Sequence, residues 1–161
     1  MYLGEYSSTL DEKGRITVPR AFRVTMEAHG HYVWYMTRGF DRCVSIYNQE
    51  EWNKLRAQMA QHGSMHTRAL DFRRMLFGSV AEVKPDGQGR MTVPPHLRKY
   101  ANLDKEAVLL GVDDHLELWS KESWDTFQER MESNYREMAV ALFEPEGDTA
   151  AVAAPGAAPG A

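Results

Sequence analysis

Hydrophobic and polar residues alternate in short segments that predict β-strands, and these segments recur in the same order in the two halves of the chain. They are rich in aliphatic and aromatic residues, and turns rich in polar residues separate them. The first half predicts strands at 5–10, 15–18, 32–37 and 43–47, and the second half at 80–84, 90–93, 107–111 and 115–119. We expect consecutive strands to pair as hairpins, two in each half.

Each half also predicts two helices, one after its second strand and one after its fourth. Pro19 and Pro94 cannot donate to a strand ladder and suit the first turn of a helix, so a short helix is expected after each proline. Asn48, with Glu51 three residues later, and Ser120 are candidate N-caps of the closing helices. The last helix carries an apolar stripe that is predicted to pack on the strands, formed by Trp124, Phe127, Met131, Tyr135 and Met138.

One sequence motif occurs twice. Residues 11–19 read DEKGRITVP, and residues 86–94 read DGQGRMTVP, 75 positions later. Farther on, segment 41–52 matches segment 113–124 at an offset of 72, in hydrophobic pattern as well as in identities. A period of this length indicates a duplicated small domain and not a solenoid repeat. We therefore predict a β-rich α+β chain whose two halves are related by a pseudo-two-fold axis.

The repeats divide the chain into four parts. We predict a first repeat at 1–62, a connecting helix at 63–77, a second repeat at 78–143 and a tail at 144–161. The connector is rich in arginine. The tail consists of Ala, Pro, Gly and a few acids, with no large side chain to bury, so it is predicted to be disordered.

Composition and charge indicate a globular protein of a reducing compartment. The 161 residues are 43% hydrophobic, which is enough for one good core or two small ones. A net charge of −4 argues against a basic coat over the whole surface but allows a local basic patch. The single cysteine, Cys43, cannot form an intramolecular disulfide. Because we find neither a membrane span of roughly 18 apolar residues nor a signal peptide, we expect the protein in the cytoplasm.

The duplicated motif places an acid and a base at positions i and i+4 of a polar turn. Each copy supplies an aspartate, a glycine and an arginine, namely Asp11, Gly14 and Arg15 in the first and Asp86, Gly89 and Arg90 in the second. The glycines stand where a tight turn requires a positive φ. One interpretation is structural: each aspartate bonds backbone N–H groups of its turn, and each arginine pairs with the aspartate.

The other interpretation is a contact with nucleic acid, because cations gather around both turns. The first copy has four cations against two acids between positions 11 and 23, a local balance of +2, and its cations are Lys13, Arg15, Arg20 and Arg23. Gln88 replaces the lysine in the second copy, but other cations keep that region basic, namely Lys84, Arg90, Arg98 and Lys99. Lysine and arginine contact DNA phosphates, and arginine also reads guanine edges. The residues alone leave both interpretations open.

Residues that would indicate an enzyme or a metal centre do not converge in the sequence. His29 and His31 are two positions apart, and His62 and His66 are four apart without further partners nearby. The pair Gly87 and Gly89 precedes a strand, whereas a phosphate-binding loop needs a helix directly after it. We predict no enzymatic activity, no small-molecule substrate, no cofactor and no metal.

The doubled D-x-x-x-R motif, with Pro19 and Pro94 after it, resembles the signature of the MraZ family. Segment 109–111 (LLG), followed by segment 116–119 (LELW) and Trp124, is also similar to the second half of that family, and the resemblance covers about residues 1–143. It implies a fold related to the AbrB-type swapped-hairpin barrel, with flanking helices, in which the two halves of one chain imitate a dimer.

The resemblance also implies a function. Members repress their own operon, the cell division and cell wall cluster, by binding repeated short sites in double-stranded DNA as ring-like homo-oligomers, so a nucleoid-associated protein is expected. If the family's residue roles apply to the matching positions of this chain, the residues that orient the turns are Asp11, Gly14, Asp86 and Gly89. The residues that contact DNA are then Lys13, Arg15 and Arg90. The basic segments beside the turns add two further candidate contacts, Arg20 and Lys84. The alternative is an antitoxin-like module that holds a protein partner, although the tail has no amphipathic stripe to fold on one.

Overall fold

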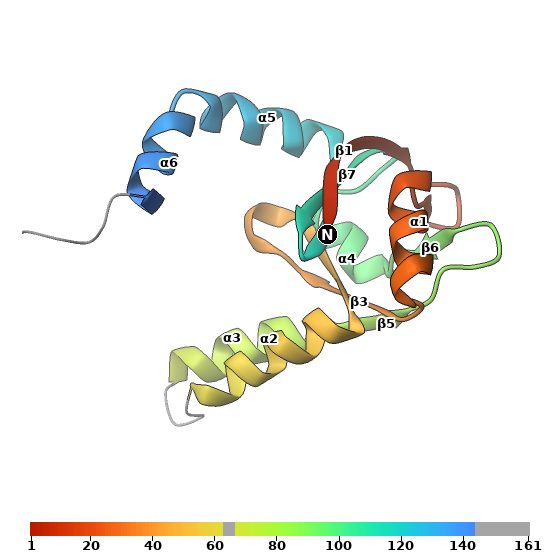
Figure 1. Cartoon of the computed structure of the whole chain (residues 1–161), viewed down its shortest axis with the longest axis horizontal. Coiled ribbons are helices and arrows are strands. Elements are labelled where there is room, and N and C mark those ends of the chain that lie inside the picture. Colours follow the sequence, from red (N-terminus) through yellow and green to blue (C-terminus); the bar gives the residue numbers. More distant parts are fainter. Residues whose placement is uncertain (63–66, 144–161) are drawn as a thin grey trace, which may run out of the picture. The chain divides into compact units, whose positions relative to one another are not determined.

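The computed structural model describes residues 1–62 and 67–143 (Figure 1). The chain forms two compact units, Met1–Asp125 and Thr126–Ala161, and the second is described as far as residue 143. The first unit contains both signature turns and every strand of the described residues. Within the described ranges, no helix is both long and apolar enough to cross a membrane. The predicted disorder of the tail at 144–161 lies outside the described residues.

Six antiparallel strands form the main sheet, and each repeat contributes its first strand to the other. The order across the sheet is β1 (Tyr2–Thr9), β7 (Glu106–Asp113), β8 (His115–Ser120), β4 (Val44–Asn48), β3 (Trp34–Arg38) and β5 (Ala81–Val83). Strand β1 of the first repeat pairs with β7 of the second, and β5 of the second repeat pairs with β3 of the first. This reciprocal exchange is the swapped arrangement that the resemblance predicted, and it relates the two halves by a pseudo-two-fold axis.

A separate two-stranded sheet joins the repeats at the signature motifs. It pairs β2 (Arg15–Thr17) with β6 (Arg90–Thr92), and Ile16 lies opposite Met91 at its centre. The predicted hairpins β3–β4 and β7–β8 are confirmed. The predicted hairpins β1–β2 and β5–β6 are wrong, because after each turn the chain leaves the main sheet. The reason is burial: Ile16 and Met91 are fully buried, and each finds its apolar neighbour in the opposite repeat.

The helices begin where the prolines and polar caps of the sequence place them. Pro19 and Pro94 are the N-cap residues of the two short helices, one position before their expected place in the first turn. Asn48 Oδ1 accepts a hydrogen bond of 3.0 Å from the Glu51 amide, and Ser120 Oγ accepts one of 3.1 Å from the Ser123 amide. The helices are α1 (Arg20–His29), α2 (Gln49–Gln61), α3 (Thr67–Gly78), α4 (Pro95–Tyr100), α5 (Lys121–Glu132) and α6 (Tyr135–Phe143), with a 3-10 turn η1 (Phe40–Arg42).

One hydrophobic core serves both repeats. Tyr2 of β1 meets the rings of Phe22 and Trp34 edge-on, at centroid distances of 5.8 and 5.5 Å. The fully buried side chains from both halves include Ile16, Val18, Met36, Ile46, Met91, Val93, Leu97, Leu109, Leu116 and Leu118. Because these side chains form a single cluster, neither repeat has a separate core, and the turns are held by the packing of both.

Helices α2 and α3 lie side by side as a helical hairpin (Figure 1). The Phe77 ring of α3 meets the Trp52 ring of α2 edge-on at 5.7 Å, and Arg73 Nη1 donates to the Met59 carbonyl at 3.4 Å. The buried Thr37 hydroxyl of β3 donates to a carbonyl near the end of α3 at 2.6 Å. The predicted connecting helix at 63–77 therefore exists from residue 67, and residues 63–66 lie outside the described part.

The predicted apolar stripe of the last helix is not continuous. Helix α5 ends at Glu132 and α6 begins at Tyr135, and the two residues between them, a serine and an asparagine, are of types that are unfavourable inside helices. Trp124 packs on Trp119 of β8 at a centroid distance of 5.3 Å. The expectation of one unbroken helical stripe from Trp124 to Met138 is therefore wrong.

Candidate nucleic-acid interface

The first signature turn is closed by the side chain of its aspartate. Asp11 Oδ1 accepts hydrogen bonds from the Lys13 and Arg15 amides, both at 2.9 Å, and Asp11 Oδ2 pairs with Arg15 Nε at 2.6 Å. Two backbone bonds complete the loop, from the Gly14 amide to the Asp11 carbonyl and from the Asp11 amide to the Arg15 carbonyl, each at 2.9 Å. One carboxylate thus fixes both the backbone of the turn and the direction of the arginine.

The second turn repeats this arrangement bond for bond. Asp86 Oδ1 accepts from the Gln88 and Arg90 amides at 2.9 Å, and Asp86 Oδ2 pairs with Arg90 Nε at 2.7 Å. The two glycines have the left-handed conformation, with φ of +72° at Gly14 and +73° at Gly89. The structural interpretation of the motif therefore describes the local geometry. It accounts for the Nε atom of each arginine but not for the Nη atoms.

Hydrogen bonds to the charged form keep both turn carboxylates ionised. Backbone bonding from Arg15 is the main influence that holds the pKa of Asp11 below its ordinary value. The equivalent bonds from Arg90 lower the pKa of Asp86 from 3.8 to about 2. Each aspartate therefore carries a full negative charge beside its arginine at neutral pH.

The low pKa of Asp86 predicts a stability change in acid. The folded pKa of about 2 lies below the ordinary value of 3.8, so the stabilisation is complete above about pH 4 and is lost as the pH falls towards 2. In denaturant titrations from pH 6 to 2, we expect the wild type to lose unfolding free energy more steeply than Asp86→Asn. Asp104→Asn, which removes an exposed carboxylate outside the turns, is the control. Parallel pH profiles for the two variants would contradict the assignment.

Each turn is also bonded to the opposite repeat. The Val93 amide donates to the Gly14 carbonyl at 2.9 Å, and the Val18 amide donates to the Gly89 carbonyl at 2.8 Å. Since Val18 directly precedes Pro19, these bonds place the start of α1 beside the second turn, which extends next to α1 in Figure 1. The two turns thus flank the three-residue β2–β6 ladder, one at each end.

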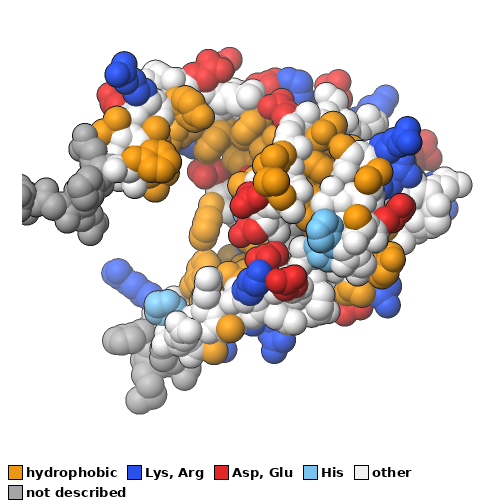
Figure 2. All heavy atoms as spheres, in the orientation of Figure 1, with side chains coloured by type: hydrophobic (Ala, Val, Ile, Leu, Met, Phe, Trp, Pro, Cys, Tyr) orange, Lys and Arg blue, Asp and Glu red, His pale blue; other side chains and the backbone are white. Residues whose placement is uncertain are grey.

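The predicted DNA-contacting residues lie on or beside the two turns. Lys13, Arg20 and Lys84 are exposed, and within ranges 1–62 and 67–143 none of them has an ion pair. Arg15 and Arg90 are half-buried, with side chains that are 26% and 29% exposed. Figure 2 shows Lys and Arg side chains at the surface on this side of the molecule, interspersed with carboxylates. The structure brings Lys13 and Arg15 together on one turn and places Arg20 near the other.

Arg23 and Arg98, which the sequence places in the basic regions but which are not among the predicted DNA contacts, also touch the turns. A Cβ built on Gly14 would stand 2.5 Å from Arg98 Cζ, and one built on Gly89 would collide with the side chain of Arg23. The two arginines correspond in the repeat, at the same offset of 75 as the motif. This correspondence and the local excess of cations were the signals in the sequence, but neither indicates that each arginine contacts the turn of the opposite repeat.

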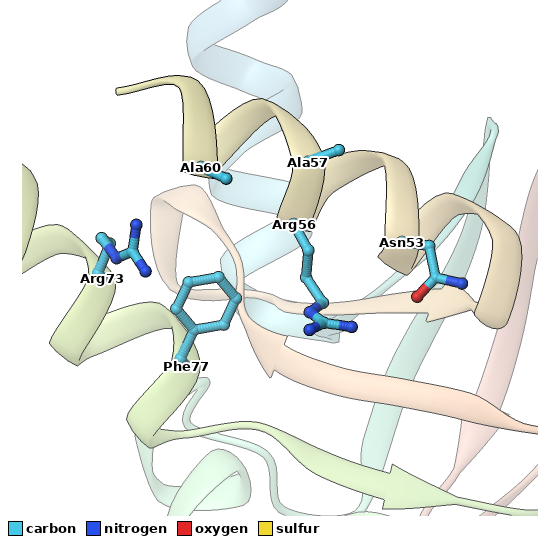
Figure 3. Close-up of a pocket in the computed structure, with 6 residues that line it drawn as sticks. All are labelled: Asn53, Arg56, Ala57, Ala60, Arg73 and Phe77. Atoms are coloured by element: carbon cyan, nitrogen blue, oxygen red, sulfur yellow. The ribbon is translucent and has the colours of Figure 1, made fainter. Parts of the chain in front are cut away.

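A hollow of about 580 Å³ between α2 and α3 contains none of the predicted site residues (Figure 3). Arg56 and Arg73 point into it beside the Phe77 ring, and its other lining residues are Asn53, Ala57 and Ala60. In the part of the chain that the structure describes, no three His, Cys, Asp or Glu side chains are grouped so as to hold a metal. Burial raises the pKa of the Cys43 thiol, which opposes formation of a nucleophilic thiolate.

The comparison with known families agrees with the duplicated architecture. A family model described as "MraZ protein, putative antitoxin-like" matches residues 1–75 and again residues 76–143. The two matches together span both repeats, including both aspartate-anchored turns and the exchanged strands. The chain therefore belongs to the MraZ family and contains two tandem MraZ domains.

Proposed function

We propose that this protein is a sequence-specific DNA-binding transcriptional regulator that represses its own operon, the cell division and cell wall cluster. The observation that carries the proposal is the duplicated turn, in which an aspartate fixes an arginine through Nε while 26% of the Arg15 side chain and 29% of the Arg90 side chain stay exposed. Lys13, Arg15, Arg20, Lys84 and Arg90 are the proposed contacts with double-stranded DNA.

The geometry of the Asp–Arg pair suits base recognition. In each turn the carboxylate takes the Nε edge of the guanidinium, at 2.6 Å for Arg15 and 2.7 Å for Arg90. Among the described residues no carboxylate pairs with the Nη atoms, which carry four of the five N–H donors. Two parallel N–H groups on a fixed plane match the O6 and N7 acceptors of guanine in the major groove. The aspartate thereby reduces the side-chain freedom that the arginine would lose on binding.

Exposed cations beside the turns would supply affinity that does not depend on sequence. Lys13, Arg20 and Lys84 can each neutralise a phosphate and release a counterion. A single pair of turns offers few such contacts. We propose that several copies of the chain assemble into a ring-like homo-oligomer and engage repeated sites about 10 bp apart, so that avidity replaces monomer affinity. Such a protein would act at the nucleoid in the cytoplasm.

Removal of the turn arginines tests the proposal. We expect the wild type to bind DNA from upstream of its own gene more tightly than a scrambled duplex, and Arg15→Ala or Arg90→Ala to weaken that binding about tenfold or more. Fluorescence anisotropy in a salt series measures both affinities. Arg68→Ala, which removes an exposed arginine of α3, is the matched control and should bind like the wild type.

Lysine substitutions separate base recognition from charge. Arg15→Lys and Arg90→Lys keep the positive charge but lose the planar pair of donors. We expect these variants to retain binding to scrambled DNA while the preference for the upstream sequence falls. Equal affinity of the wild type for both duplexes, or alanine variants that bind as the wild type does, would refute the regulator.

The description of the matching family gives a second candidate, an antitoxin-like module that holds a protein partner. The two proposals differ in what copurifies from a lysate. A DNA-binding protein should carry nucleic acid with a high 260/280 nm absorbance ratio that falls after a salt wash. A module of the second kind should elute with a partner protein in fixed proportion at the same salt.

A further inference from the structure

An arginine from each repeat covers the turn of the other repeat. Arg98 of α4 lies against Gly14, where an added Cβ would stand 2.5 Å from Cζ, 2.6 Å from Nη1 and 2.7 Å from Nε. Arg23 of α1 lies against Gly89, where an added Cβ would stand 3.2 Å from both Nε and Nη1. The contact is close because both positions are glycine, and it occurs twice, in accordance with the pseudo-symmetry of the chain.

Neither arginine has the partner that a purely structural arginine would need. The Nε–H groups of Arg23 and Arg98 are buried and donate to no acceptor among the described residues. Within ranges 1–62 and 67–143 no carboxylate pairs with either side chain, whereas Arg15 and Arg90 are each paired with an aspartate. A buried donor without an acceptor is unfavourable for folding alone. Among the described residues, therefore, neither guanidinium forms an ion pair, although Glu27 and Asp86 line the same hollow as Arg23.

The position of these charges coincides with the proposed DNA contacts. Gly14 stands between Lys13 and Arg15, so Arg98 adds a third cation to the first turn. In the second turn Gln88 occupies the place of Lys13, and Arg23 returns a positive charge to that turn. A hollow of about 200 Å³ lies beside Arg23, between α1 and the second turn, and gives solvent access to this side chain.

We propose that Arg23 and Arg98 bind DNA phosphates, each beside the turn of the opposite repeat. Each DNA-contacting turn is then composite: one repeat supplies the aspartate-anchored arginine that reads the bases, and the other supplies a cation for the adjoining phosphate. This inference rests on the proposed function and extends it to two residues outside the D-x-x-x-R motif. It also makes the geometry of each contact depend on the packing of both repeats.

The salt dependence of DNA binding tests this inference. Each phosphate contact contributes about 0.9 to the slope of log affinity against log salt. We expect Arg98→Gln and Arg23→Gln each to reduce the slope by about 1 and the affinity at 0.1 M salt by about eightfold, for upstream and scrambled DNA alike. Arg98→Lys should restore most of the slope. Arg68→Gln is the matched control on α3 and should leave the slope unchanged.

The outcomes distinguish this inference from the proposed function. If Arg98→Gln and Arg23→Gln keep the wild-type slope, with or without a loss of affinity, the arginines only position the turns and the phosphate contacts are refuted. If the wild type does not prefer upstream DNA, sequence-specific regulation fails, while the slopes still decide whether the two arginines contact phosphates. Thermal unfolding of each variant checks that it is folded. If Arg98→Gln does not fold, the salt slope of Arg98→Lys is compared with that of the wild type instead.

Discussion

Replacement of Ile16 by alanine is expected to lower the free energy of unfolding by about 2–5 kcal/mol, the range for truncation of a buried aliphatic side chain. Ile16 is fully buried at the centre of the β2–β6 pair, directly opposite Met91, which is also fully buried. The cavity would therefore open where the two repeats meet. Because one core serves both halves, the loss should appear as a single cooperative transition of the first unit.

Urea denaturation followed by tryptophan fluorescence measures this effect. Thr17→Ala is the matched control, because Thr17 is the next residue of the same strand and its side chain is exposed. We expect that variant to unfold within about 0.5 kcal/mol of the wild type. Two separate transitions in Ile16→Ala, one for each repeat, would contradict the shared core.

Replacement of Gly89 by alanine is expected to destabilise the protein by about 2–5 kcal/mol. The left-handed conformation, with φ of +73°, contributes about 1–2 kcal/mol of this cost for a residue with a Cβ. Displacement of Arg23, with which the new methyl group would collide, adds about 1–3 kcal/mol. DNA affinity should fall as well, because Arg90 follows Gly89 directly and depends on the same turn.

Gly87 provides a control within the same turn. It has no positive φ, and an added Cβ would meet nothing within 4 Å. Gly87→Ala should therefore keep both the stability and the DNA affinity of the wild type, as measured by denaturation and anisotropy. If Gly87→Ala and Gly89→Ala lost equal stability and equal DNA affinity, the turn would tolerate no side chain at either position. The positive φ of Gly89 and its contact with Arg23 would then not explain the effect.

Features that depend on neighbouring residues could be predicted from the sequence. The caps at Asn48 and Ser120, the positive φ of Gly14 and Gly89, and the hairpins β3–β4 and β7–β8 each follow from residues a few positions apart. The aspartate and arginine of each turn are also local, at i and i+4. The repeat itself was visible because identities recur at a constant offset.

Features that depend on distant partners could not be predicted in the same way. A short strand such as β2, with one apolar residue, is equally compatible with β1 and with β6, and only the packing of Ile16 on Met91 decides between them. The contacts of Arg23 and Arg98 with the opposite turns arise from that exchange, so no spacing within one repeat indicates them. The stripe of the last helix failed for a different reason, since its spacing assumed an unbroken helix through residues 133 and 134.

The exchanged strands have a consequence for how the protein responds to dilution. Two separate repeats would have to meet in solution before β1 could pair with β7 or β2 with β6. In one chain the same pairing is intramolecular and therefore does not depend on the concentration of the protein. Each chain therefore keeps both turns assembled at nanomolar concentrations, at which a regulator made from two separate repeats would lose half of its binding surface to dissociation.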